Sequence, residues 1–150
     1  MATKVLMVCL GNICRSHLAE GIFRHLAYAH DFVVDSAGTA NYHIGAPPDH
    51  RSIQVAAKNG IDIRDQKARQ LTLNDIVTFD HILVMDEQNL KNVHALCTST
   101  EQQTKISLLT SSCGHGATHV PDPYYGDEKD FEFVFKLVHD CCKNWLTKHA

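Results

Sequence analysis

The stretch VCLGNICRS, residues 8–16, places a thiol and a guanidinium in one short loop directly after an apolar run. If the five residues between Cys9 and Arg15 curl round an anion, the sulfur lies at the centre of the curl. A helix that begins after the loop would direct free N–H groups and about half a positive charge at the same point. These groups and the planar fork of Arg15 favour thiolate over thiol. The spacing therefore predicts an oxyanion-binding loop with Cys9 as a nucleophile aimed at phosphorus.

Other residues of the stretch support this loop. Ser16 can donate a hydrogen bond to the sulfur and help it leave in the second step of a displacement. Gly11 and Asn12 permit the curl, because both tolerate backbone geometry that most residues avoid. Cys14 has two interpretations: it packs at the start of the helix, or it protects Cys9 as a reversible disulfide. The stretch differs from a Walker loop, which needs GxxxxGK followed by Ser or Thr.

A proton donor for the leaving group is predicted much later in the chain. A displaced alkoxide or phenoxide must be protonated, and hydrolysis of phosphocysteine then needs a base, so one carboxyl group can serve both steps. Asp122 in PDPYYG is the candidate, since prolines on both sides stiffen its loop and Tyr124 and Tyr125 could wall the site. The alternative for this segment is an ordinary surface turn.

The elements that position these residues alternate between strand and helix. Apolar runs predict buried strands at residues 4–9, 32–36, 81–86 and, more weakly, 105–109. Helical periodicity or capping signals predict helices after Arg15, from Asp49 to about Asn59, at 87–96 and through the last segment from Phe131. This alternation is typical of an α/β domain with a parallel sheet. In such sheets ligands bind beyond the carboxyl ends of the strands, where residues 9–16 lie.

Composition indicates one ordinary globular domain covering residues 1–150. The chain is 44% hydrophobic with a net charge of −3, which disfavours nucleic acid or an acidic membrane surface as a partner. The N-terminal apolar run from Val5 to Leu10 is too short to be a secretory or transmembrane segment, so a cytoplasmic location is expected.

Cysteines and histidines raise two further expectations. The six cysteines are unevenly spread through a chain long enough for a core, so free thiols are expected rather than a disulfide framework. Cys113, His115 and His119 form the best metal-like cluster, but no matching ligand motif accompanies it. A solvated loop is therefore predicted there, with no metal or other cofactor.

With both motifs placed, the chain resembles the low molecular weight protein tyrosine phosphatases almost end to end. The shared segments are VCLGNICRS, DSAGT, HIGAPPD, KARQLT (67–72), VMDEQNL (84–90) and DPYYGDEKDFEFVF (122–135). The resemblance implies a three-layer fold with a four-stranded parallel sheet of order 2-1-3-4. It also implies metal-free hydrolysis of phosphotyrosine in proteins and of small aryl phosphates, with inorganic phosphate as a product.

The same resemblance implies roles for individual residues. Cys9 is the nucleophile, Arg15 binds phosphate and stabilises the transition state, and Asp122 is general acid and then base. The phosphate-binding residues are Leu10, Gly11, Asn12, Ile13, Cys14, Arg15 and Ser16. Tyr42, Tyr124 and Tyr125 line the substrate cleft, although Tyr42 could instead pack on its own loop.

Three positions add questions to the resemblance. His17 stands where the family commonly has proline, which removes a rigid helix start and could add a titrating group beside the phosphate. Gln66 replaces a histidine of some members, in a hydrogen-bond network with Asn12, Ser16 and Ser36. Asp86 either buttresses the phosphate loop or caps the third helix.

Two other functions remain open at this stage. Thiol-coupled arsenate reductases resemble these phosphatases but need further cysteines that form a relay disulfide, and Cys97 and Cys113 are far apart in sequence. A non-catalytic phosphotyrosine reader is the other alternative, but it would need neither the thiol nor the acid.

Overall fold

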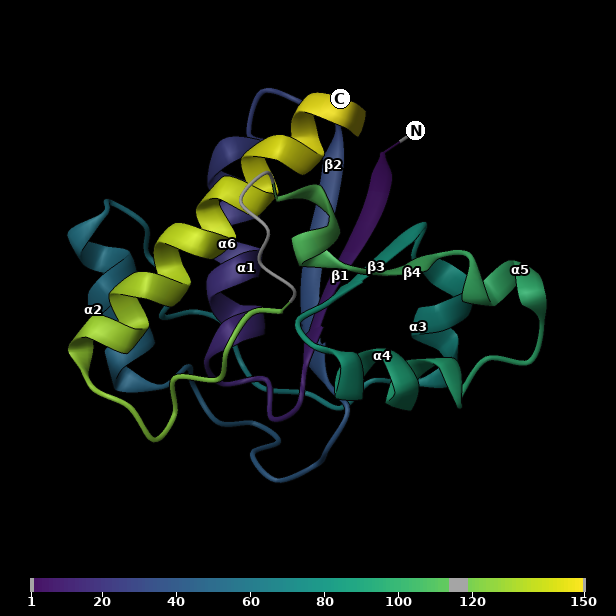
Figure 1. Ribbon diagram of the computed structural model, residues 1–150, viewed down its shortest axis with the longest axis horizontal. Coiled ribbons are helices and arrows are strands. Elements are labelled where there is room, and N and C mark those ends of the chain that lie inside the picture. The colour runs from purple at the N-terminus through teal and green to yellow at the C-terminus, as the bar shows by residue number, and fades with distance from the viewer. Residues whose placement is uncertain (1, 114–118, 150) are drawn as a thin grey trace.

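The computed structural model describes residues 2–113 and 119–149, and its centre is one parallel sheet. Its strands are β1 (Thr3–Cys9), β2 (Phe32–Gly38), β3 (His81–Val84) and β4 (Ile106–Leu108). They lie in the order β2-β1-β3-β4, so β1 pairs with a neighbour on each side (Figure 1). The predicted strands and their order are confirmed, and the loop that follows β1 leaves from the middle of the sheet.

Helices cover both faces of the sheet. Helices α1 (Arg15–Leu26), α2 (His50–Lys58) and α6 (Glu128–His149) lie on one side. Helices α3 (Leu73–Thr78) and α4 (Glu87–His94) lie on the other (Figure 1). The chain also forms α5 (Thr100–Gln103) and a 3-10 turn, η1 (Leu109–Ser112). No helix in the described part of the chain is long and apolar enough to cross a membrane.

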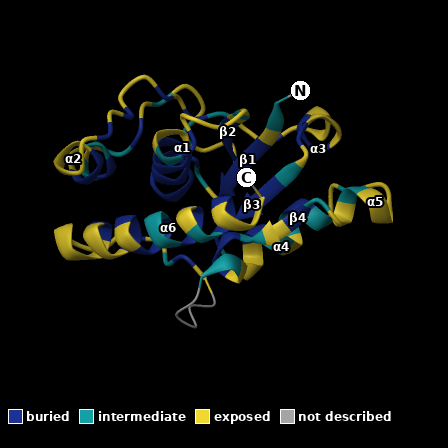
Figure 2. Cartoon of the chain, turned by 90° about the horizontal axis from the view of Figure 1, so that it is seen from above, coloured by how far each residue is buried: buried dark blue, intermediate teal, exposed yellow. Residues whose placement is uncertain are grey.

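The position of β1 inside the sheet explains why its sequence is almost continuously apolar. Val5, Met7 and Cys9 face the core beneath α1 and α6, whereas Leu6 and Val8 face the core beneath α3 and α4. Alternate side chains of a strand point to opposite faces, and here both faces are covered by helices (Figure 2). This alternation directs the Cys9 side chain to the α1 side at the carboxyl end of the sheet.

One cysteine pair overturns the expectation that all six thiols are free. Cys113, just after η1, forms a disulfide with Cys141 in the buried face of α6, while Cys9, Cys14, Cys97 and Cys142 are free. The two bonded residues are separated by 28 positions, with a Cα–Cα distance of 4.7 Å. Sequence spacing does not show which cysteines meet, because the folding of α6 against the sheet brings this pair together.

Reduction of this disulfide is expected to lower the free energy of unfolding by about 3.5 kcal/mol, because the bond restricts a loop of this length in the unfolded chain. Urea unfolding with and without dithiothreitol measures the effect. Cys113→Ser should match the reduced wild type and should not respond to dithiothreitol, whereas Cys97→Ser, at a free thiol, should respond as the wild type does. Equal stability of oxidised and reduced wild type would contradict the prediction.

Candidate active site

The loop between β1 and α1 owes its curl to one residue with a left-handed backbone. Asn12 has φ of 55°, the one positive value at a non-glycine position in the described residues. Gly11 has no positive φ; it lies beside His43, where an added Cβ would be 3.2 Å from a ring carbon. The prediction that Asn12 permits the curl is confirmed. Gly11 instead makes room for the neighbouring loop.

Several N–H groups of this loop are available to an anion. Among the described residues, those of Gly11, Ile13 and Cys14 donate to no other protein group. Helix α1 begins at Arg15, so the unpaired N–H groups of its first turn add to the same positive end. The N–H of Asn12 donates to the Cys9 sulfur at 3.3 Å. The loop thus combines free donors with a sulfur that is itself hydrogen-bonded.

A chain of buried hydrogen bonds runs from the Cys9 sulfur to a carboxylate. Ser16 Oγ lies 3.0 Å from the sulfur and accepts a hydrogen bond from Asn12 Nδ2 at 2.7 Å. Asn12 Nδ2 also donates to Ser36 Oγ at 3.1 Å, and Ser36 Oγ donates to Glu20 Oε1 at 2.6 Å. The hydroxyl proton of Ser36 is therefore committed to Glu20. Asn12 then satisfies the Ser16 oxygen, which leaves the Ser16 hydroxyl proton free to point at the sulfur.

Glu20 is the residue of this chain that the sequence analysis did not single out. It is 5% exposed, and its second oxygen accepts from Arg24 at 2.7 Å. Burial raises the pKa of Glu20, although Ser36 and Arg24 favour its charged form. The available signal was an acidic residue four positions after Ser16, on the same side of a helix whose neighbours are apolar.

Arg15 is held between two carboxylates. Its side chain is buried, and Nη1 donates to Asp86 Oδ2 at 2.7 Å and to the Val120 carbonyl at 3.1 Å. Its Nη2 lies 3.7 Å from Asp122 Oδ2. Burial alone would lower the pKa of Arg15, but the nearby charges of Cys9, Asp86 and Asp122 outweigh it and raise the pKa. The guanidinium is therefore charged and fixed in orientation.

Asp86 has both of the roles that the sequence left open. One carboxylate oxygen accepts from the Asn89 N–H at 2.8 Å and caps α4, while the other binds Arg15. Because β3 lies next to β1, a residue just after β3 can reach the loop that follows β1. One side chain thus ties the start of α4 to the loop between β1 and α1.

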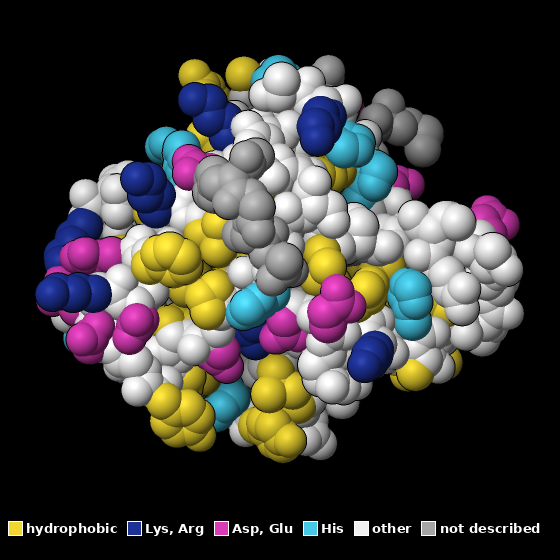
Figure 3. Space-filling view, in the orientation of Figure 1, with side chains coloured by type: hydrophobic (Ala, Val, Ile, Leu, Met, Phe, Trp, Pro, Cys, Tyr) yellow, Lys and Arg dark blue, Asp and Glu magenta, His cyan; other side chains and the backbone are white. Residues whose placement is uncertain are grey.

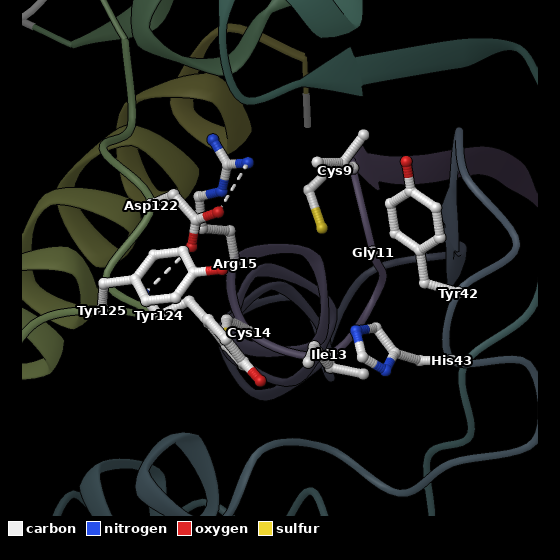
Figure 4. A pocket seen from close by; sticks show the side chains of 11 residues that line it. Cys9, Gly11, Ile13, Cys14, Arg15, Tyr42, His43, Asp122, Tyr124 and Tyr125 are labelled. Atoms are coloured by element: carbon white, nitrogen blue, oxygen red, sulfur yellow. Dashed lines mark hydrogen bonds and ion pairs between the residues drawn. The ribbon is translucent and has the colours of Figure 1, made fainter.

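These groups meet in a pocket of about 340 Å³ at the carboxyl ends of the strands. Figure 4 shows the Cys9 sulfur pointing into it between two pairs of rings, Tyr42 with His43 and Tyr124 with Tyr125. Residues 9–11, residues 13–15 and Asp122 complete the lining. In Figure 3 hydrophobic side chains gather at the lower end of the molecule, where Figure 1 shows the loops that follow the strands.

The structure divides the predicted site residues into two sets. Tyr42, 71% exposed, lines the pocket, and its ring also lies edge-to-face against that of His43 in its own loop. Asn12 and Ser16 are fully buried and do not line the pocket; they contact the sulfur from behind. His43 lines the wall beside Tyr42 and was not predicted, because a histidine in a glycine- and proline-rich loop gives no periodic signal.

Comparison with known proteins shows the family of this chain. Residues 4–150 match the family described as low molecular weight phosphotyrosine protein phosphatase. The chain belongs to this family. A relative of that name from Homo sapiens is 43% identical over 153 residues, covering 98% of this chain and 96% of the relative. The chain is accordingly a protein-tyrosine phosphatase.

Solved structures of phosphatases are similar over the whole fold. A protein tyrosine phosphatase from Entamoeba histolytica has a TM-score of 0.94 at 36% identity, covering 99% of this chain and 97% of that one. An arginine phosphatase from Drosophila has a TM-score of 0.92 at 30% identity, covering 98% of each chain. Phosphatases named for two different phosphorylated residues, tyrosine and arginine, therefore share this fold.

Within this phosphatase, Gln66 does not take part in the hydrogen-bond network predicted for it. Neither its side-chain oxygen nor its nitrogen has a partner among the described residues, although the side chain is buried. Its amide nitrogen lies 3.5 Å from the position that a Cβ on Gly21 would occupy. Gly21 is in α1, five positions after Ser16. The buried partner of Ser36 is Glu20 instead.

Cys14 packs at the start of α1 as a buried thiol. It is 4% exposed and is not bonded to Cys9. Burial, followed by the charges of Asp49, Asp122 and Cys9, raises the pKa of Cys14 to about 12. Its thiol is therefore protonated at neutral pH, which agrees with the packing role. A reversible bond with Cys9 under oxidation stays a prediction.

The residues of the metal-like cluster do not form a site in the described structure. Cys113 is in the disulfide with Cys141, and His115 lies outside the described residues. No group of three or more histidine, cysteine or acidic side chains within residues 2–113 and 119–149 is placed to hold a metal ion.

His17 is not a titrating group beside the phosphate, contrary to the expectation. The ring is fully buried in α1, outside the pocket lining, and neither nitrogen meets hydrogen-bond geometry with a described residue. Burial lowers the pKa of His17 from 6.5 to about 4, so the ring is neutral in the folded protein at neutral pH. Position 17 thus holds a packed neutral imidazole, and protonation of this ring lowers the stability of the folded protein.

The His17→Leu variant is expected to lose less stability than the wild type on acidification. Between pH 6.5 and 4 the unfolded chain binds a proton at His17 that the folded chain does not, so wild-type stability falls as the pH is lowered through this window. The loss from pH 7 to 4.5 should be smaller by about 2 to 3 kcal/mol in the variant. Urea unfolding at both pH values measures it. His25→Leu, on the exposed side of the same helix, should retain the wild-type dependence, and an unchanged dependence in His17→Leu would refute the assignment.

Proposed function

We propose that the chain hydrolyses phosphotyrosine in proteins and small aryl phosphates through a phosphocysteine intermediate on Cys9. The observation that carries the proposal is the convergence of Cys9, Arg15 and Asp122 in one pocket, although Asp122 is more than a hundred positions from the other two. A thiol, a fixed guanidinium and a carboxyl group are the three groups that this reaction needs.

The phosphoryl group would bind in the loop after β1. Arg15 would hold two of its oxygens with the planar fork, in an orientation set by Asp86 and the Val120 carbonyl. The loop N–H groups and the start of α1 would stabilise the remaining negative charge. The proposed phosphate-binding residues are Leu10, Gly11, Ile13, Cys14 and Arg15, with Asn12 and Ser16 supporting the sulfur from behind.

In the first step the Cys9 thiolate attacks phosphorus. A sulfur–phosphorus bond forms, the bond from phosphorus to the aryl oxygen breaks, and Asp122 gives its proton to that oxygen. In the second step Asp122 takes a proton from water, which attacks phosphorus and breaks the sulfur–phosphorus bond. The Ser16 hydroxyl, 3.0 Å from the sulfur, stabilises the departing thiolate. Inorganic phosphate leaves, and both Cys9 and Asp122 return to their starting states.

The pocket walls favour an aryl leaving group. Tyr42 and His43 face Tyr124 and Tyr125 across the opening, and a flat phenyl ring can stack between such rings (Figure 4). Phosphoarginine is the competing substrate, since a similar fold belongs to an arginine phosphatase. A guanidinium leaving group carries positive charge, so a site for it would favour several acidic side chains. Asp122 is the one acidic residue that lines the described pocket. The aromatic walls therefore support phosphotyrosine.

Arsenate reduction is less well supported by the positions of the cysteines. Cys97 packs against the core beneath α3 and α4, on the sheet face opposite Cys9. Cys113 is in the disulfide with Cys141, and Cys14 has a raised pKa that disfavours its thiolate. A relay needs a thiolate that can attack the loaded Cys9. A non-catalytic reader is also disfavoured, because it would have no use for the carboxyl group.

Trapping of the intermediate tests the proposal. The enzyme is mixed rapidly with a phosphotyrosine peptide, quenched with acid and digested, and mass spectrometry should find a phosphoryl group on Cys9. Turnover should persist in a chelator and should be lower with the matched phosphoarginine peptide. Faster turnover of the phosphoarginine peptide would reject the substrate class, and arsenate reduction with thioredoxin but no peptide hydrolysis would reject the reaction.

A further inference from the structure

The first turn of α2 lies between two loops. One is the proposed phosphate loop, residues 9–15, and the other carries Asp122. Asp49, the residue before α2, donates its N–H to the Ile13 carbonyl of the phosphate loop at 2.7 Å. The Asp49 side chain accepts from the N–H of Arg51 at 2.9 Å and caps the helix. The start of α2 is thus anchored directly to the loop that surrounds the Cys9 sulfur.

Arg51 extends this anchor to the loop of Asp122. Its guanidinium binds Asp49 through Nε and Nη2, each at 3.1 Å. Nη1 also donates to the Gly126 carbonyl at 3.1 Å, and Nη2 donates to the Tyr124 carbonyl at 2.8 Å. The guanidinium carbon lies 4.5 Å from the centre of the Phe131 ring, near the start of α6. All three nitrogens of Arg51 are engaged, yet Arg51 does not line the pocket.

Other contacts of the described residues also support the loop of Asp122. Before Asp122, the Val120 N–H donates to the Met85 carbonyl at 2.7 Å, and the Val120 carbonyl accepts from Arg15. After Asp122, the Tyr124 N–H donates to Asp122 Oδ1 at 3.1 Å. The Asp122 side chain is 46% exposed. Val120 therefore fixes the loop before Asp122, and Arg51 fixes it afterwards.

We propose that Arg51 is a positioning residue, which holds the Asp122 carboxyl group at the distance from the phosphate loop that proton transfer requires. The proposal rests on the proposed function, in which Asp122 is the general acid. A displacement of about 1 Å in such a group can reduce a rate about a hundredfold. Among the described residues, Arg51 supplies the hydrogen bonds that tie Tyr124 and Gly126 to α2. Loss of Arg51 would remove both of them.

The chain contains a matched control for Arg51. Arg64 has the same local arrangement with Asp62: a backbone N–H, Nε and one Nη all donate to the carboxylate of the residue two positions earlier. Both side chains of this second pair are exposed, and neither lines the pocket. Substitution of Arg64 therefore removes an equivalent Asp–Arg pair without loss of a contact to either loop.

A double-mutant cycle tests the positioning role. The values of kcat/KM are measured for p-nitrophenyl phosphate, which has a good leaving group, and for phenyl phosphate, which has a poor one. Arg51→Gln should lose about tenfold with phenyl phosphate and less than about threefold with p-nitrophenyl phosphate. In an Asp122→Ala background the same change should cost less than about twofold with either substrate. Arg64→Gln should match the wild type throughout.

The outcomes separate this inference from the proposed function. Equal losses with both substrates, or the same loss in the Asp122→Ala background, would overturn the positioning role while the acid role stands. If Asp122→Ala itself shows no leaving-group dependence, the acid role fails and the positioning role fails with it. Thermal melting checks each fold. If Arg51→Gln does not fold, Arg51→Lys takes its place, because one ammonium group cannot reach Asp49 and both carbonyls together.

Discussion

Replacement of Cys9 by serine is expected to reduce aryl phosphate hydrolysis to less than about 10⁻⁴ of the wild-type kcat/KM while inorganic phosphate still binds. The serine hydroxyl is not ionised at neutral pH and is a much weaker nucleophile than a thiolate. The free N–H groups of the loop and the guanidinium of Arg15 are unchanged by this substitution. Steady-state assays with p-nitrophenyl phosphate measure the rate, and isothermal titration calorimetry measures phosphate binding.

Phosphate affinity in Cys9→Ser should be about equal to that of the wild type, because the groups that would bind the anion are unchanged. Cys97→Ser serves as the control, since Cys97 lies on the other face of the sheet and should keep full activity. Retained turnover in Cys9→Ser would refute the phosphocysteine mechanism. Loss of phosphate binding together with activity would show that the substitution had disrupted the loop itself.

Replacement of Asp122 is expected to slow hydrolysis by about 10²- to 10⁴-fold for phenyl phosphate and far less for p-nitrophenyl phosphate. Without a proton donor, the rate depends on how well the leaving oxygen carries negative charge. Phenoxide carries it poorly, whereas p-nitrophenoxide delocalises it into the ring. The dependence of kcat/KM on the leaving group across a series of substituted phenyl phosphates measures the effect.

Asp122→Asn separates proton donation from loop geometry. Asparagine has nearly the same shape and can still accept the Tyr124 N–H, which the aspartate accepts at 3.1 Å. It cannot supply an acidic proton, so its activity should fall as far as that of Asp122→Ala. If Asp122→Asn is nearly as active as the wild type, Asp122 shapes the loop but is not the acid. Equal losses across all leaving groups would also exclude the acid role.

Patterns carried by neighbouring residues were predicted well from the sequence. The run from Lys4 to Cys9 forms the middle strand, and Asp49 caps α2 as expected. Asn59 and Gly60 end that helix, with Gly60 at φ of 77°. By contrast, α3 and α5 are six and four residues long, so neither repeats its apolar positions often enough to show a helical period. Their formation depends on caps and on packing against the rest of the fold.

The amino-acid sequence by itself determined which chemical groups the opening loop brings together. Cys9, Asn12 and Arg15 lie within seven positions, between a strand and a helix that local periodicity predicts, although Asp86 and Val120 from later in the chain fix the orientation of Arg15. Partners far apart in the chain were decided only by the tertiary structure. These are Glu20 with Ser36, Cys113 with Cys141, and Arg51 with the loop of Asp122. Such pairs form because parallel strands bring their carboxyl ends to one edge and helices pack across the sheet. Neither kind of contact produces a regular residue spacing from which the pair could be predicted.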